Sequence, residues 1–320
     1  MSGSAELIAD GGEAAAGEEF FRSRPFLAAE GVTHTLRIEA EGRELAAPLV
    51  VREIPGSDRS DASSPYGYPG FHVSDFDPSL GGAESDAPPI DPTSIDLSPT
   101  GLVAIFLRHT LGEPPLAGAS ERNIVQIADP AQPPKSRGSD RNQINRNRRA
   151  GYEVRIVPGP ETSPEDRAGF LAAYEQTMRR AGAERRYFFG AAYFDRILGA
   201  DRAWLALADA PDGGIAAGSV TVESDGFLHY YLSGSADANL RDSPMKNVVA
   251  ALVDLGAERG MPLNLGGGIT RGDRLEEFKR GFANREQPWH TSEIVCDPVA
   301  YRTLSADRPD SGFFPAYRMG

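Results

Sequence analysis

A chain of 320 residues, of which 40% are hydrophobic, is long enough for two domains and can bury substantial cores. Its single cysteine, Cys296, excludes an internal disulfide and a cysteine-rich metal site, and no apolar run approaches the ~18 residues of a membrane span. The net charge of −13 arises mostly from residues 1–100, which hold 18 acidic residues against 6 basic ones. This distribution leaves an RNA partner open but argues against a large RNA footprint.

The first part of the chain predicts strands and few helices. Residues 1–20 are small and acidic and predict a disordered tail, and because they lack the pattern of a signal peptide we expect a cytoplasmic protein. A loop rich in Ser, Asp, Pro and Gly is predicted from Gly56 to about Asp96. Strands are predicted at residues 34–40, 44–51, 102–107 and 123–127.

The second part, after a boundary near residue 150, predicts alternating helices and strands. Ser163-Pro164 is typical of a capped helix start, and Phe170, Tyr174 and Met178 then share one helix face. Further helices are predicted at residues 190–198, 244–258 and 273–281, and strands at 203–208, 215–222, 227–232, 262–265 and 290–296.

This order of elements resembles the N-acetyltransferase (GNAT) fold, an α/β fold with a mixed sheet flanked by helices. Residues 151–320 are expected to form a C-terminal GNAT-like subdomain, and residues 21–150 a degenerate N-terminal copy of it. In ordinary acetyltransferases, a glycine-containing loop before the central helix grips the coenzyme A pyrophosphate through backbone N–H groups. The corresponding segment here, Ala238 to Pro244, has no glycine, and Pro244 lacks an N–H donor, which argues against acetyl-CoA.

Several segments instead resemble the Fem family, which moves amino acids from aminoacyl-tRNA onto amines. The matching segments are Ser64 to Gly70, Phe170 to Phe189, Tyr230 to Ser235, Leu265 to Gly268, and the helix with Leu275, Phe278, Lys279 and Phe282. Because the long helical arm of some Fem proteins is missing, the resemblance is to the shorter members. These include tRNA-dependent alanyl transferases of uridyl-peptide antibiotic pathways, from which enzymes of cell-wall (peptidoglycan) synthesis are not distinguished.

The resemblance implies a transferase that forms a peptide bond without a covalent enzyme intermediate and without a cofactor. The donor would be aminoacyl-tRNA carrying a small amino acid such as alanine or glycine, and the acceptor an amine of a peptide or peptidyl-nucleotide. Lys279 takes the position at which the family is proposed to stabilise the oxyanion. The alternative interpretation of Lys279 is a surface lysine on an amphipathic helix.

The other candidate site residues are expected to bind substrate. Tyr66 and Tyr68 are candidates for the acceptor pocket, or for simple turn packing, and Asp61 or the neighbouring Asp58 for taking the amine proton. Tyr231, Gly267 and Phe278 are further candidates, with a tight turn as the alternative for the glycine. Because Tyr230 and Tyr231 alternate faces of a strand, at most one of them is expected to face a site, and the other to pack in the core.

A basic segment, Lys135 to Arg155, carries seven basic residues against two acidic ones. Arg141, Arg146, Arg148 and Arg149 are candidates for tRNA phosphate contacts, with a solvated helix as the alternative. The five histidines lack the spacing of a zinc site, so no metal is expected. Two other functions stay open, an acyl-CoA-dependent N-acyltransferase and a non-catalytic binding domain of the same fold.

Overall fold

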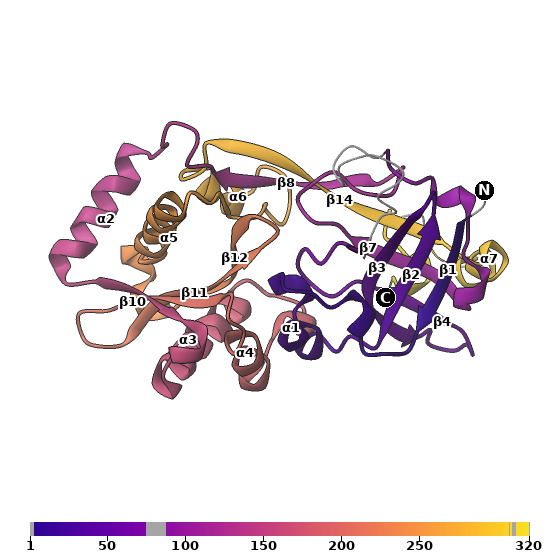
Figure 1. Ribbon diagram of the computed structural model, residues 1–320. Coiled ribbons are helices and arrows are strands. Elements are labelled where there is room, and N and C mark those ends of the chain that lie inside the picture. Colours follow the sequence, from indigo (N-terminus) through magenta and orange to yellow (C-terminus); the bar gives the residue numbers. More distant parts are fainter. Residues whose placement is uncertain (1–2, 75–87, 307, 309–311, 320) are drawn as a thin grey trace. The chain divides into compact units, whose positions relative to one another are not determined.

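The computed structural model describes residues 3–74, 88–306, 308 and 312–319, and it divides into two compact units (Figure 1). Unit 1 comprises residues 1–122 and 289–320, and unit 2 comprises residues 123–288. The chain enters unit 2 within β8 (Ser120–Ala128) and returns to unit 1 within β14 (Arg285–Val295). Unit 2 is therefore inserted into unit 1, whereas the sequence predicted a single boundary near residue 150.

The physical reason for this difference is strand pairing. Strand β8 pairs with β13 (Leu263–Asn264), Ala128 lying opposite Leu263, so residues before 150 already belong to unit 2. Helix α2 (Gly138–Ala150) packs on α5 (Met245–Arg259), where the side-chain amide of Asn147 donates to that of Asn247 at 2.8 Å.

Unit 1 is built on a mixed sheet with the strand order β6, β1, β2, β3, β4, β7, β14, and β5 pairs with β3 beside this path. Neighbouring strands are antiparallel except for the parallel pairs β1–β6 and β4–β7. Its strands, apart from β14, are β1 (Gly3–Ile8), β2 (His34–Ala40), β3 (Arg43–Glu53), β4 (Ser60–Ser63), β5 (His72–Ser74), β6 (Ile95–Asp96) and β7 (Leu102–Arg108), and its helices are α1 (Arg24–Ala29) and α7 (Pro298–Ser305).

The predicted pair of strands around Glu41-Gly42 is present as the hairpin β2–β3. Glu41 and Gly42 have φ angles of 55° and 74°, and a type I′ hairpin turn requires a positive φ at both of its central residues. The predicted loop from Gly56 to Asp96 is only partly a loop, because it contributes β4, β5 and β6. Its residues 75–87 lie outside the described residues.

The N-terminal segment corrects another prediction, because residues 3–20 contribute to the core of unit 1 instead of forming a disordered tail. Strand β1 pairs with β2, and Ala5, Ala15 and Phe20 are at most 3% exposed. Asp10 accepts hydrogen bonds from the backbone of Gly12 at 2.9 Å and from the Thr35 hydroxyl at 2.9 Å, which fixes the turn after β1. The segment is acidic on average, but the side chains that it buries, those of Ala5, Ala15 and Phe20, are apolar.

Unit 2 contains the mixed sheet β8, β13, β12, β11, β10, β9, in which β12 and β13 run parallel. Its strands beyond β8 and β13 are β9 (Glu153–Pro158), β10 (Ala203–Asp209), β11 (Ile215–Ser224) and β12 (Phe227–Ser235), and its helices beyond α2 and α5 are α3 (Pro164–Arg180), α4 (Ala191–Leu198) and α6 (Arg274–Arg280). The α/β order predicted for this part of the chain is confirmed, and both units are built on a mixed sheet with flanking helices.

Helices cover both faces of the unit 2 sheet, α5 on one side and α3 with α4 on the other (Figure 1). Helix α3 approaches β12 so closely that a Cβ atom on Gly234 would lie 2.4 Å from the Cα atom of Tyr174. A glycine is therefore required at this position for α3 to pack on the strand. The start of α3 is as predicted, since the Ser163 hydroxyl accepts from the backbone N–H of Asp166 at 3.1 Å.

Candidate active site

Strands β12 and β13 separate soon after they meet, and this is where the candidate site begins. They pair at only two positions, Leu228 with Leu263 and His229 with Asn264. Strand β12 then continues to Ser235, while the segment that follows β13 turns away at Leu265 into the loop Gly266–Gly268. Gly266 has a φ angle of 74°, which favours glycine at this turn.

Lys279 on α6 points at this glycine loop. Its Nζ atom donates a hydrogen bond to the carbonyl oxygen of Gly267 at 2.7 Å, and the residue is only 8% exposed. Burial lowers the pKa of Lys279 to about 8, against a smaller opposing effect of the Asp273 carboxylate. The structure therefore excludes the interpretation of Lys279 as an ordinary surface lysine and brings Lys279 and Gly267 together.

Asp273 fixes where α6 begins. Its carboxylate accepts from the backbone N–H groups of Glu276 at 2.8 Å, Ile269 at 2.7 Å and Thr270 at 3.0 Å. It thus caps the helix and ties it to the end of the glycine loop. Asp273 followed three residues later by a glutamate is a capping signature that the sequence already contained.

The other candidates of unit 2 are aromatic and have different surroundings. The Phe278 ring packs edge-on against Phe282 at 5.6 Å and joins the apolar cluster beneath α5, so it serves the core. The Tyr231 hydroxyl lies 3.0 Å from the Tyr193 hydroxyl of α4, whereas Tyr230 packs into the cluster on the α5 side. As the alternation of a strand predicts, the two tyrosines of β12 have different neighbours.

The loop before α5 is held by the protein itself. The backbone carbonyl of Asp242 accepts from Gln143 at 3.0 Å and from Asn147 at 2.8 Å, and its carboxylate accepts from the hydroxyl of Tyr152 at 2.8 Å. The helix starts at Met245 after Pro244, and no side chain caps it.

Two of the N–H groups in the first turn of α5 are also occupied. Lys246 N–H donates to Ser243 at 3.0 Å, and Asn247 N–H donates to Pro244 at 2.9 Å. A pyrophosphate bound at this helix start would have to displace these bonds and lie beside the Asp242 carboxylate. The geometry therefore agrees with the sequence argument against coenzyme A.

The four arginines proposed to bind tRNA lie on the exposed side of α2. Arg141, Arg146, Arg148 and Arg149 are all exposed, while Ile144 is buried. Within the described ranges, none of the four arginines forms an ion pair with a carboxylate, because the one acidic residue of the helix, Asp140, binds Lys246 at 2.9 Å. Their charge is therefore available to an anionic partner.

In unit 1, the tyrosines of the Ser64–Gly70 loop are held in a tightly packed turn. Tyr68 packs edge-on against Phe21 at 5.6 Å and Trp289 at 5.3 Å, while Tyr66 is 37% exposed. A Cβ atom on Gly67, whose φ angle is 113°, would lie 2.6 Å from the ring of Phe21. The loop is thus rigid, and Tyr66 is its exposed tyrosine.

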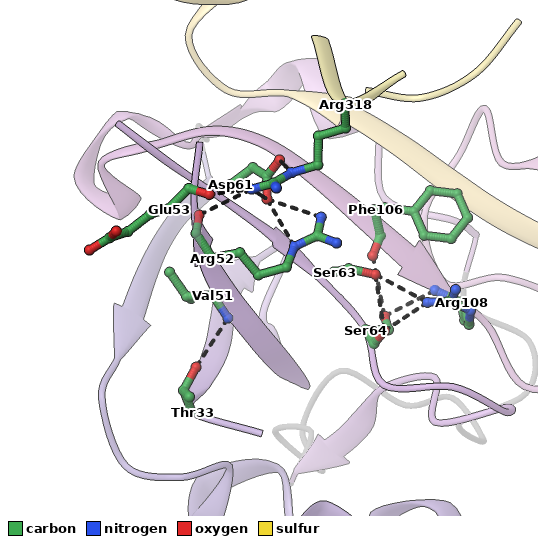
Figure 2. A network of polar contacts seen from close by, with 10 residues as sticks. All are labelled: Thr33, Val51, Arg52, Glu53, Asp61, Ser63, Ser64, Phe106, Arg108 and Arg318. Carbon is green, nitrogen blue, oxygen red and sulfur yellow. Dashed lines mark hydrogen bonds and ion pairs between the residues drawn. The ribbon is translucent and has the colours of Figure 1, made fainter. Parts of the chain in front are cut away.

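The Asp61 carboxylate is buried between two arginines. Figure 2 shows its carboxylate between the guanidinium groups of Arg52 and Arg318, and Asp61 is 0% exposed. Arg52 approaches one carboxylate oxygen at 3.0 Å, and Arg318 donates to the same oxygen at 2.9 Å and to the backbone carbonyl of Glu53 at 2.7 Å. The carboxylate is fully buried and occupied by these two arginines, so it is not open to a substrate amine. We therefore assign Asp61 to holding the C-terminal segment on unit 1, and not to catalysis as the sequence suggested.

Two asparagines near Lys279 were not found by the sequence reasoning. Asn123 donates to the carbonyl oxygen of Gly268 at 3.0 Å, and Asn264 accepts from the backbone N–H of Gly266 at 2.8 Å. A polar residue in a short apolar strand directly before three glycines was a usable signal for Asn264. Asn123 had none, since only the fold brings it to the loop.

Comparison with known proteins defines the class of fold first. The model of the acetyltransferase (GNAT) domain family matches residues 134–280, which lie in unit 2. No curated protein sequence matches the chain significantly. The chain has a Fem-like N-acetyltransferase fold, and the matched segment contains both the glycine loop and Lys279.

Particular solved structures share this fold over both units. The crystal structure of FemX is 12% identical with a TM-score of 0.56 and covers 84% of this chain and 89% of its own. The structure of L-PGS from Bacillus licheniformis is 13% identical with a TM-score of 0.51 and covers 85% and 88%. The C-terminal domain of a lysylphosphatidylglycerol synthetase from Agrobacterium fabrum is 14% identical with a TM-score of 0.59 and covers 93% and 94%.

Two further findings concern the described part of the chain. None of its helices has the length and apolarity needed to cross a bilayer. Among the same residues, no three His, Cys, Asp or Glu side chains come together in a way that could hold a metal ion.

Proposed function

We propose that the chain transfers an aminoacyl group from aminoacyl-tRNA to an amine of a peptide or peptidyl-nucleotide acceptor. The observation that carries the proposal is the buried Lys279, which points at a glycine loop beside separating strands in a Fem-like fold. The shared fold with FemX supports the resemblance, and the Agrobacterium fabrum domain belongs to a protein named for a product that contains a lysyl group.

The reaction is aminolysis of an ester. The amine lone pair attacks the ester carbonyl carbon, a C–N bond forms, and the C–O bond to the tRNA ribose breaks. The leaving ribose oxygen takes the proton that the amine loses, so the step needs no protein base and no cofactor. The protein has to align the two substrates and stabilise the oxyanion of the tetrahedral stage.

Lys279 is the residue that we assign to the oxyanion. A protonated lysine has three donors, and one of them is held by the carbonyl of Gly267 at 2.7 Å. The other two donors are left for the oxyanion. In a buried setting, such a charge–charge contact is stronger than it is in water.

The remaining assignments place the substrates. The exposed arginines of α2 are proposed to contact tRNA phosphates, because they have no carboxylate partner in the described part of the chain. Tyr66 is proposed to contact the acceptor, and Tyr68 to support the loop that presents it. The transferred amino acid is proposed to be small, such as alanine or glycine, and the acceptor an antibiotic peptide or a cell-wall precursor.

A donor comparison tests the proposal. Purified protein is offered labelled aminoacyl-tRNAs and labelled acetyl-CoA in parallel, with a panel of peptide and nucleotide-linked amines, and the products are detected by mass spectrometry. We expect transfer from tRNA alone and no product after RNase treatment. Transfer from acetyl-CoA alone would establish an acyl-CoA N-acyltransferase, and tight binding of a peptide without any product would establish a non-catalytic binding domain.

A further inference from the structure

The position of Lys279 depends on a loop that has little structure of its own. Gly266, Gly267 and Gly268 contribute no side chains, so neighbouring residues must fix the direction of their carbonyl groups. At the start of the loop, the backbone N–H of Gly266 donates to Asn264 at 2.8 Å. At its end, the carbonyl of Gly268 accepts from the Asn123 amide at 3.0 Å.

Asn123 is itself held in one orientation. Its Oδ1 atom accepts from the backbone N–H of Ile124 at 2.8 Å, while its Nδ2 atom donates to Gly268. Both ends of the amide are thus used, and a flipped amide would lose both bonds. Because Asn123 belongs to β8, it ties the glycine loop to the sheet of unit 2.

The same side chain occupies the space beside Gly267. A Cβ atom on Gly267 would lie 2.5 Å from the Nδ2 atom of Asn123 and 2.7 Å from its Oδ1 atom. The backbone of Gly267 does not have a positive φ, so its conformation would accept an alanine. The Asn123 side chain is therefore what a methyl group at position 267 would meet.

We propose that Asn123 is a positioning residue for the reaction: it fixes Gly267 so that its carbonyl group holds the Lys279 ammonium toward the reacting ester. The inference rests on the proposed function for the role of Lys279, but the contact between Asn123 and the loop is independent of it. Asn123 is proposed to touch neither substrate and to act through the loop, by its bond to Gly268 and its packing beside Gly267.

Steady-state kinetics of two variants test the role. Asn123→Ala removes the amide, and Asn123→Asp keeps its size and its bond from Ile124 but loses the donor to Gly268. In both variants we expect kcat to fall about 10- to 100-fold, with KM for both substrates within about twofold, because misplacement of a catalytic group by ~1 Å has effects of this size. Asn239→Ala is the control, since Asn239 is also half-buried and also donates one hydrogen bond, to Tyr152 at 3.1 Å. A kcat within about twofold of wild type in both variants would overturn the proposal.

A double-mutant cycle tests the route through Gly267. Gly267→Ala alone should lower kcat, because the methyl group displaces Asn123. Added to Asn123→Ala, the same change should have almost no further effect, because the obstructing side chain is gone. Multiplicative losses in the double variant would show that the two residues act separately and would contradict the inference.

Chemical labelling separates this inference from the proposed function. The chain has three lysines, Lys135, Lys246 and Lys279, so acetylation by an amine-reactive ester can be followed at each one by mass spectrometry. In Asn123→Ala we expect Lys279 to be labelled about 10-fold faster than in wild type, while Lys246 and Lys135 keep their rates, because Lys279 is released from the Gly267 carbonyl. If wild type transfers nothing from tRNA but this change is seen, the proposed function fails and the positioning contact stands. An unchanged Lys279 rate overturns the positioning role whatever the activity.

Discussion

Lys279 must carry a proton when it stabilises an oxyanion, and its surroundings decide at which pH it does. Burial lowers its pKa to about 8 from the ordinary value of 10.5, so the protonated form is present at neutral pH and is lost as the pH rises through about 8. The charge that we propose for the oxyanion is therefore lost in a pH range that kinetic assays reach.

The first prediction is a decline in the single-turnover transfer rate above pH ~8. Lys279→Arg should lack this decline, although it is slower throughout, because a guanidinium stays protonated in this range. The measurement is the rate of amide formation by quenched flow between pH 6 and 9.5. A wild-type rate that keeps rising to pH 9.5 would contradict the prediction. A decline that persists in Lys279→Arg would show that deprotonation of Lys279 is not its cause.

The second prediction concerns Asp61. Asp61→Asn leaves Arg52 and Arg318 without their common carboxylate. Because their side chains are 39% and 18% exposed, we expect a cost below the ~3–5 kcal/mol of a fully buried ion pair. We expect the unfolding transition of unit 1, followed by Trp289 fluorescence in urea, to move to a lower urea concentration. Unchanged stability with a large loss of transfer activity would instead support the proton-acceptor role that the sequence suggested.

At the scale of elements, the sequence was most informative where local signals coincide with tertiary structure. The Ser163-Pro164 start of α3 and the strands β10 to β12 could be predicted because capping and apolar periodicity are local. Strand β1 could not be predicted, because its burial depends on pairing with β2, which lies far along the chain: Ser4 pairs with Glu39. The return of the chain to unit 1 after residue 288 is equally non-local.

The candidate site shows the same division. The motif around Lys279 identified the residue and its helix, and the structure added its burial and its bond to Gly267. Asn123 is distant in sequence from the loop that it holds, so no local pattern could indicate it. The charge pattern of α2 was visible in the sequence, but it did not show that the four exposed arginines of the helix form no ion pair with a carboxylate among the described residues.

The third prediction belongs to helix α2. Arg146→Gln combined with Arg149→Gln should weaken tRNA binding about 5- to 20-fold at 0.15 M salt and should lower the dependence of log Kd on log salt by about 1–2, because two phosphate contacts are lost. Filter binding across a salt series measures both quantities.

The control for this prediction lies on α3. Arg179 and Arg180 are also arginines of unit 2, but Arg179 lies 3.4 Å from Glu175 and Arg180 is paired with Asp237. Arg179→Gln with Arg180→Gln should therefore change tRNA affinity less than the α2 pair does. Equal losses from the two pairs would indicate general electrostatic attraction and no specific role for α2.

At the scale of the whole molecule, each unit holds one buried histidine and one of the two tryptophans. His109 in unit 1 and His229 in unit 2 are at most 2% exposed. Burial lowers the pKa of each to about 4, helped at His109 by the neighbouring His290 and opposed at His229 by its hydrogen bond to Ser224. Both imidazoles are therefore neutral in the folded protein near neutral pH.

The fourth prediction follows from the sign of these shifts. A folded-state pKa near 4 lies below the unfolded value of about 6.5, so the unfolded chain binds more protons between these values. The contribution of the two buried histidines to the free energy of unfolding is fully present above pH ~6.5. It falls as the pH decreases, by about 2 kcal/mol for each histidine at pH 5.

Two fluorescence probes assign the effect to its unit. Trp289, whose indole N–H donates to the His109 carbonyl at 2.8 Å, reports on unit 1, and Trp204 of β10 reports on unit 2. His109→Gln should flatten the pH dependence of the Trp289 transition, with His34→Gln as the control. If the stability of unit 1 falls equally steeply between pH 6.5 and 5 in wild type and in His109→Gln, His109 is not the cause of the fall.

The most direct test of the central claim is the single-turnover rate of amide formation from labelled aminoacyl-tRNA by wild type and by Lys279→Met at pH 7. Methionine keeps the apolar bulk of the side chain but has no donor. We predict that the rate falls about 100- to 1000-fold while the affinity for tRNA stays within about twofold, as for the loss of one oxyanion donor. A Lys279→Met rate within about threefold of wild type would contradict the assignment of Lys279 and, with it, the mechanism.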